Sequence, residues 1–189
     1  MDNSLRSYRC LPVLEYILGD YSITPIRYID RLAVLKWRNE QMYHLRQAKP
    51  LTVAEQEHYF TTIIPKLFEQ RQPNQILFSF LKNGKCIGYG GLVHINWIDK
   101  HAEISFIMNT ELESVEFDLN WTRFLRQIET VAFEELNFHK LFVYAFDIRP
   151  HLYLMLMKNN YFLDATLKEH CFFNNKYIDV VIHSKISNL

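Results

Sequence analysis

The chain has 189 residues, of which 49% are apolar and 22% are charged. This length and composition are typical of one folded domain with a substantial core. Because 21 lysines and arginines balance 21 aspartates and glutamates, the net charge gives no reason to expect binding to nucleic acid or to an anionic membrane surface.

The N-terminal region and the cysteines favour a cytoplasmic protein. The apolar stretch at residues 11–19 contains Glu15, makes a poor signal peptide and is too short to cross a bilayer. Cys10, Cys86 and Cys171 stand far apart, without the spacing of a disulfide framework or a zinc site. The eight histidines form no metal-binding motif. We therefore expect a cytoplasmic location, reduced cysteines and no metal.

The first regular elements follow an N-terminal extension at residues 1–20, which we expect to pack on the domain. Residues 21–27 alternate in polarity and contain β-branched side chains, which predicts a strand. A helix should then begin at Asp30, because Leu32, Leu35 and Trp37 cluster toward one face of a helical pattern.

A second helix is predicted at residues 53–70 by a local signal. Thr52 and Glu55 have the spacing of a capping box, in which each side chain bonds to the main chain of the other residue. Pro65 lies inside this stretch and should kink or break the helix.

The rest of the chain alternates between strand and helix patterns, with an Asn-Gly turn typical of a hairpin after the next strand. We predict strands at 75–81, 86–97 and 101–109, a helix at 120–137, a strand at 140–146, a helix at 150–158, and strands at 161–173 and 176–186. This order indicates an α+β fold, with one domain at residues 21–189 whose antiparallel sheet is covered by helices.

Several stretches together carry a resemblance to a known family. They are WRNEQ at 37–41, CIGYGGLVHINWIDKHAEISFIM at 86–108, AFEELNFHKLF at 132–142, AFDIRPH at 145–151 and FFNNKYIDVVIHSKI at 172–186. In this order and spacing the chain resembles the GCN5-related N-acetyltransferase (GNAT) superfamily, and most closely its amino-sugar-nucleotide and ribosomal-protein N-acetyltransferase branches. The resemblance implies a mixed, mostly antiparallel central sheet of about seven strands, with helices on both faces. It also implies acetyl-CoA as the co-substrate.

In that family two central strands part, and the pantetheine arm of acyl-CoA lies between them. The resemblance places the main chain of Ile107, Met108 and Asn109 at this gap. The family commonly has a tyrosine on the last helix that reprotonates the departing thiolate. Here that position is Leu156, and Tyr153, nearly one turn earlier, is the candidate substitute, although a buried aromatic residue is the alternative.

The resemblance also identifies candidates on the acceptor side. Glu103 matches the general base of the histone-acetylating branch, where a buried carboxylate takes a proton from the amine, and a salt-bridged surface glutamate is the alternative. His94 and Asn96 should share a face of the preceding strand and reach the acceptor, with His94 as a rival base or a structural residue. By analogy, Arg38 and Asn39 at the end of the first helix should line the acceptor mouth.

The chain departs from the family at the turn that binds pyrophosphate. Residues 117–121 fall on that turn and contain no glycine, although the family uses glycines there to bring main-chain N–H groups close to the phosphates. Glu116 and Asp118 should repel phosphate. Arg123 is a basic side chain that can compensate, and Arg149 falls near the position of the asparagine that contacts the CoA arm.

Two functions therefore stay open. The first is an N-acetyltransferase that moves an acetyl group from acetyl-CoA to a primary amine, such as an amino-sugar nucleotide in surface polysaccharide biosynthesis. The second is a catalytically silent GNAT-fold binding module that has lost CoA binding. The polar residues around Glu103 favour the enzyme, and the turn without glycine favours the binding module. Sheet edges of such a fold are compatible with a homodimer.

Overall fold

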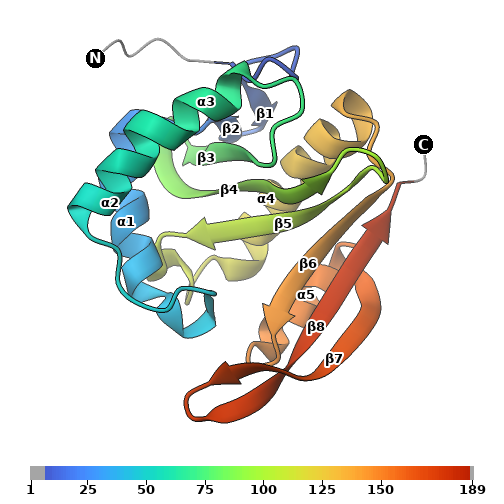
Figure 1. Ribbon diagram of the computed structural model, residues 1–189. Helices are drawn as coiled ribbons and strands as arrows, with labels where there is room; N and C mark the ends of the chain where they lie inside the picture. Colours follow the sequence, from blue (N-terminus) through green and yellow to red (C-terminus); the bar gives the residue numbers. More distant parts are fainter. Residues whose placement is uncertain (1–6, 188–189) are drawn as a thin grey trace.

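An eight-stranded sheet forms the centre of the computed structural model, which describes residues 7–187 (Figure 1). Its strands are β1 Tyr16–Leu18, β2 Tyr21–Pro25, β3 Ile76–Lys82, β4 Lys85–Asn96, β5 His101–Met108, β6 Lys140–Phe146, β7 Phe162–Phe173 and β8 Lys176–Ile186. Their spatial order is β1-β2-β3-β4-β5-β6-β8-β7, and every neighbouring pair is antiparallel except β5 with β6. The predicted mixed, mostly antiparallel sheet is thus confirmed. The strand beyond the predicted number is β1, whose three residues are too few for polarity to reveal a strand.

Helices cover both faces of the sheet, as expected. They are α1 Arg31–Glu40, α2 Val53–His58, α3 Ile64–Glu69, α4 Phe117–Glu129 and α5 Pro150–Lys158. Side chains of α1 and α2 line a pocket with Ser105 of β5, whereas the neighbouring Phe106 stacks on Phe124 of α4. Because successive strand residues point to opposite faces, α1 and α2 lie on one side of β5 and α4 on the other (Figure 1).

The predicted second helix exists as two α-helical pieces, α2 and α3, and Pro65 lies at the start of the second piece. Thr52 and Glu55 form the expected capping box. Helical dihedrals continue from α2 through a π-helical segment, Tyr59–Ile63, into α3. Pro65 lies in the first turn of α3, where a main-chain N–H is not required for the helix.

Helix α4 begins at Phe117, earlier than the predicted start at residue 120, and continues as a π-helical segment, Thr130–Glu135. The earlier start has a packing reason, because Phe117 and Trp121 are both buried on the sheet side of the helix. Asp118 in the first turn also suits the positive end of the helix dipole.

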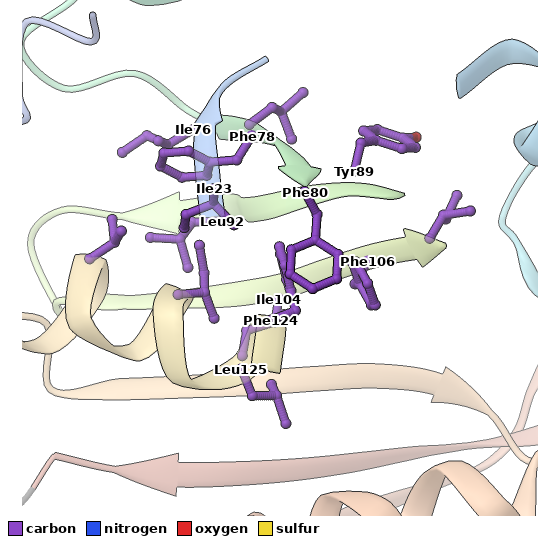
Figure 2. Packing of buried hydrophobic residues seen from close by; sticks show 14 of the residues in the cluster. Ile23, Ile76, Phe78, Phe80, Tyr89, Leu92, Ile104, Phe106, Phe124 and Leu125 are labelled. Carbon is purple, nitrogen blue, oxygen red and sulfur yellow. The ribbon is translucent and has the colours of Figure 1, made fainter. Parts of the chain in front are cut away.

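The main core has residues on both faces of the sheet, and Figure 2 shows the part that includes Phe124 and Leu125 of α4. The Phe106 and Phe124 rings stack with centroids 4.1 Å apart, and Phe80 meets both rings edge-on. Gly90 allows this close approach, since a Cβ there would lie 2.2 Å from the Ser105 carbonyl oxygen and 2.9 Å from the Phe124 ring. The glycines of β4 are therefore explained by packing.

Strands β5 and β6 part from one another along their length. Their paired residues are His101–Lys140, Ala102–Leu141 and Glu103–Phe142. Beyond Glu103, β5 continues to Met108 and β6 to Phe146 without further pairing between them. We call this opening the β5–β6 gap.

None of the helices formed by residues 7–187 has the length and apolar character that a membrane span requires. Cys10, Cys86 and Cys171 are all free thiols.

Candidate active site

The residues of β5 whose main-chain groups face the gap differ from those expected. The Asn109 N–H donates to the Ile87 carbonyl at 2.7 Å, so the main chain of Asn109 points to β4. Because main-chain groups alternate along a strand, those of Ile107 also face β4, and those of Phe106 and Met108 face the gap. Of the three residues expected at the gap, Met108 alone therefore has its main chain on this edge.

The Met108 carbonyl already has a partner. It accepts a hydrogen bond from Nε2 of Gln41 at 2.7 Å, and Gln41 is fully buried after the end of α1. The same amide nitrogen lies 3.1 Å from Oγ1 of Thr110. Sequence patterns gave no reason to single out Gln41, because its partners Met108 and Thr110 are distant from it in the chain.

Glu103 stands at the fork where β5 and β6 part. It is 5% exposed, and both carboxylate oxygens are bonded. Oε1 accepts from the Arg46 guanidinium, and Oε2 contacts Nδ1 of His94 at 2.8 Å. A carboxylate accepts hydrogen bonds, so the neutral imidazole tautomer that fits this contact carries its proton on Nδ1 and leaves Nε2 as an acceptor.

A β-bulge turns His94 toward Glu103. The register of β4 against β5 shifts between Val93 and Asn96, and His94 has a φ of 48°, in the left-handed region. The His94 side chain remains 64% exposed. The expectation that His94 and Asn96 share a face assumed regular alternation, which the bulge interrupts, and the two side chains bond to different partners.

Asn96 instead belongs to the turn between β4 and β5. Its Oδ1 accepts from the main-chain N–H groups of Ile98 and Asp99 at 3.0 and 2.9 Å, and its Nδ2 donates to the Asp99 carboxylate at 2.7 Å. These bonds are local, and they give Asn96 a structural role in the turn.

Arg46 and Tyr144 complete the site, and the sequence analysis did not assign either a role. The Arg46 guanidinium lies over the Tyr144 ring, 4.4 Å from its centroid, while it also binds Glu103. Tyr144 lies on β6 beyond the last pair with β5, and its hydroxyl is 3.4 Å from Sγ of Cys171. Burial, followed by this bond to Cys171, raises the pKa of Tyr144 to about 12. The Tyr144 hydroxyl is therefore protonated at neutral pH.

Tyr153 on α5 contacts neighbouring groups through both its hydroxyl and its ring. Its hydroxyl donates to the Phe146 carbonyl at 2.9 Å, and its ring stacks on His183 with centroids 5.1 Å apart. Burial raises the pKa of Tyr153 above its usual value. Leu156, at the family's tyrosine position, is part of the core.

A pocket of about 410 Å³ lies on the α1–α2 side of the sheet, next to Glu103. Val93, which pairs with Glu103, lines it together with Ser105, two residues further along β5. The other lining residues are Ile26, Val34, Arg38, Leu51, Glu55, Gln56, Tyr59, Phe60, Gln75, Leu77 and Tyr89. This volume is within the range of small-molecule sites.

The two charged residues of this pocket differ in their bonding. Arg38 uses Nη1 for the Tyr89 hydroxyl at 2.7 Å and Nε for Gln47 at 3.1 Å. Both carboxylate oxygens of Glu55 are used by the capping box and by Lys49. The Thr52 main-chain N–H, as the largest cause, lowers the pKa of Glu55 to about 2.

Asn39 was also expected at the acceptor mouth, but its side chain holds a loop in place. Nδ2 donates to the Leu51 carbonyl at 2.8 Å, and Oδ1 accepts from the Leu51 N–H at 2.8 Å and from Gln47 at 3.0 Å. Asn39 thus positions the segment that carries Arg46 and Gln47.

The open end of the gap is bridged by an ion pair. Glu113 follows β5, Arg149 follows β6, and their side chains meet at 2.9 Å. Glu113 also accepts from the Tyr43 hydroxyl at 3.0 Å, and the Arg149 guanidinium lies 5.3 Å from the Phe117 ring centroid. Arg149 is 5% exposed, so this basic residue is enclosed by protein.

The other acidic groups around the start of α4 are neutralised by lysines. Lys82 lies 3.1 Å from the Glu116 carboxylate, and Lys158 lies 2.6 Å from that of Asp118. These pairs reduce the phosphate repulsion that the sequence implies.

Arg123 is not at the gap. Its guanidinium lies 5.8 Å from the ring centroid of Tyr21 on β2, and β3 and β4 stand between β2 and β5 in the sheet. From this place near β2, Arg123 cannot supply the missing phosphate contact at the gap.

Residues 7–187 contain no cluster of three or more histidine, cysteine, aspartate or glutamate side chains that could hold a metal ion. Among the described residues, the site brings together the His94–Glu103 pair, the Arg46–Tyr144 contact and a parted strand edge.

Comparisons with known proteins bear on the family and the fold. A family model described as an acetyltransferase (GNAT) domain matches residues 23–182. The spermidine N-acetyltransferase of Vibrio cholerae, solved with CoA and spermine, has a TM-score of 0.78 at 18% identity, over 89% of this chain and 96% of that chain. A probable acetyltransferase has a TM-score of 0.70 at 24% identity, over 92% of this chain and 97% of that chain. At these identities the likeness to solved structures shows the fold.

Proposed function

Because the chain belongs to the GNAT acetyltransferase family, we propose that it transfers an acetyl group from acetyl-CoA to the primary amine of a small molecule. The observation that carries this proposal is the His94–Glu103 pair, which stands at the fork of the β5–β6 gap and beside a pocket of about 410 Å³. A donor in the gap and an acceptor in the pocket would meet at this pair.

The acetyl donor needs a strand edge and a proton donor, and the gap offers both. The main chain of Phe106 and the N–H of Met108, which do not pair with β6, can bond an extended pantetheine arm as an added strand would, whereas the Met108 carbonyl is used by Gln41. Acetyl-CoA supplies the acetyl group as an activated thioester. Tyr144 lies on β6 beyond its last pair with β5, and its protonated hydroxyl contacts Sγ of Cys171 on β7 in this structure; we assign to this hydroxyl the proton that the departing thiolate takes up.

The acceptor needs a base. When the amine nitrogen attacks the thioester carbon and the C–S bond breaks, the nitrogen must lose a proton. Both oxygens of Glu103 are bonded and buried, whereas Nε2 of His94 is on a side chain that is 64% exposed. We therefore assign the proton to His94, with Glu103 as the residue that holds the imidazole in the correct tautomer.

The charges of the pocket support an acceptor with an anionic part, such as an amino-sugar nucleotide. Arg38 brings a cation to the pocket, while Glu55 is occupied by Thr52 and Lys49. The Vibrio cholerae enzyme was solved with spermine, a polyamine. A polyamine would meet the Arg38 charge here without an unpaired carboxylate to offset it.

The test begins with binding and transfer. Acetyl-CoA should raise the melting temperature with concentration, and thiol release should be faster with an amino-sugar nucleotide than with spermidine. Absence of both a shift and transfer at millimolar acetyl-CoA would favour the silent binding module, which the turn at residues 117–121 and the Glu113–Arg149 pair support.

The base is tested by chemical rescue. His94→Ala should lower the transfer rate by about 10²- to 10⁴-fold, and added imidazole should restore part of it. Glu103→Gln should also slow transfer, without rescue by imidazole. If His94→Ala keeps full activity while Glu103→Gln loses it, Glu103 itself is the base and the assignment to His94 is wrong.

A further inference from the structure

The Glu113–Arg149 pair joins two segments that the gap separates. Glu113 lies in the segment between β5 and α4, and Arg149 lies between β6 and α5. The side chains are 16% and 6% exposed, so the pair is largely shielded from solvent. The ion pair therefore links the two sides of the gap beyond the ends of β5 and β6.

Arg149 has more hydrogen-bonding capacity than Glu113 uses. Its Nη2 donates to Oε1 of Glu113 at 2.9 Å, while its Nε is buried and has no acceptor among residues 7–187. Buried donors are almost always bonded in native proteins. An anion with several oxygens, held by more than one N–H of the guanidinium, would satisfy this group better than the carboxylate does.

Two histidines lie close to the same guanidinium. Burial and then the Arg149 charge lower the pKa of His151, whose ring is 4.6 Å from that of Phe117. Burial and then Arg149 also lower the pKa of His44, which stands at the end of the segment after α1. The surroundings of Arg149 thus combine one fixed cation and two imidazoles, and the anion paired with that cation is Glu113.

We propose that Arg149 is the binding residue for the diphosphate of acyl-CoA, and that Glu113 is an internal anion which occupies Arg149 until that diphosphate displaces it. This inference rests on the proposed function and names the phosphate contact within it. It explains how a chain without glycine at residues 117–121 can hold phosphate, because a side chain replaces the main-chain N–H groups. It also implies that the affinity for acetyl-CoA is lowered by the competition with Glu113.

Calorimetry with three ligands separates the possible outcomes. The ligands are inorganic pyrophosphate, acetyl-CoA and S-acetylpantetheine, which lacks the diphosphate. Glu113→Gln should bind pyrophosphate and acetyl-CoA about tenfold more tightly than the unchanged protein does, and S-acetylpantetheine equally well. Arg149→Gln in the Glu113→Gln background should abolish the gain.

Glu116→Gln is the matched control, because it removes the same charge near the start of α4 but from the Lys82 pair. An equal gain in Glu116→Gln, a gain for S-acetylpantetheine, or unchanged pyrophosphate binding in Glu113→Gln would overturn the inference. Pyrophosphate binding that follows the expected pattern without any acetyl transfer would retain the inference and reject the proposed enzyme. Transfer with unaltered affinity in Glu113→Gln would do the reverse.

Discussion

Strands β3, β4 and β5 on one side of the gap are largely buried between α1–α3 and α4, whereas on the other side the β7–β8 hairpin leaves most of its β7 side chains in solvent. The strands on the first side contribute to the main core. On the other side, Ile178 and Val180 of the hairpin form a small separate cluster with Phe146 of β6. The two sides meet through a short stretch of main-chain pairing between β5 and β6. Because β5 and β6 pair only at their first residues, the well-packed strands on one side and the more exposed hairpin on the other can be held in one sheet and still leave an opening between β5 and β6.

The largest effect should come from a core residue on the first side. Phe124→Ala removes a fully buried ring that stacks on Phe106, and we expect it to lower the free energy of unfolding by about 3–5 kcal/mol. Phe172→Ala on the hairpin, where the residue is 64% exposed, should change it by less than about 0.5 kcal/mol. Urea denaturation of both variants checks the contrast, and similar losses would show that the hairpin is as tightly packed as the core.

The second prediction concerns the free energy of unfolding at acidic pH. Burial and the Arg149 charge across the gap lower the pKa of His44 to about 3, so the unfolded chain binds a proton that the folded chain does not. Stability contributed by His44 is thus complete above pH 6.5 and is lost as the pH falls toward 3. This single group can change the free energy of unfolding by at most about 1.4 kcal/mol per pH unit.

His44→Gln should therefore reduce the loss of stability between pH 7 and pH 4, measured by urea denaturation at several pH values. His58→Gln, at an exposed position on α2, is the control and should keep the slope of the unchanged protein. An unaltered slope in His44→Gln would remove His44 from the acid response.

The smallest effect should come from a side-chain link across the junction. Lys185 of β8 pairs with Glu129 of α4 at 2.8 Å, and both side chains are mostly buried. We expect Lys185→Gln to lower the free energy of unfolding by up to about 1 kcal/mol. Lys168→Gln breaks an exposed pair with Asp179 inside the hairpin and should cost less. Equal costs in urea denaturation would mean that the junction gains nothing from the Lys185 link.

Local patterns were enough to predict most of the fold. The strand at 140–146, the helix at 150–158 and the strand at 176–186 have the predicted bounds. Each of them is specified by the periodicity of its own side chains, by a proline at the helix start or by a tight turn. The strand β1 was missed because its short stretch pairs only through contacts with β2.

The candidate site was harder to predict. The resemblance singled out Glu103, and an expected place on the preceding strand singled out His94; their contact with one another is visible only in the structure. Asn39 and Asn96 are polar residues near the site, yet they bond to their own loop and turn. Sequence position alone cannot separate a side chain that serves a ligand from one that serves its neighbouring main chain.

By itself the sequence determined the order of helices and strands and the family, because both depend on short patterns of residues that are close together in the chain. Tertiary structure alone decided that Arg46 joins Glu103 to Tyr144, that a bulge turns His94 to the carboxylate, and that Glu113 meets Arg149. The physical reason is distance along the chain. Charges and rings from separate elements act on one another only after the sheet and its helices have brought them within a few ångströms, roughly the range over which such contacts matter.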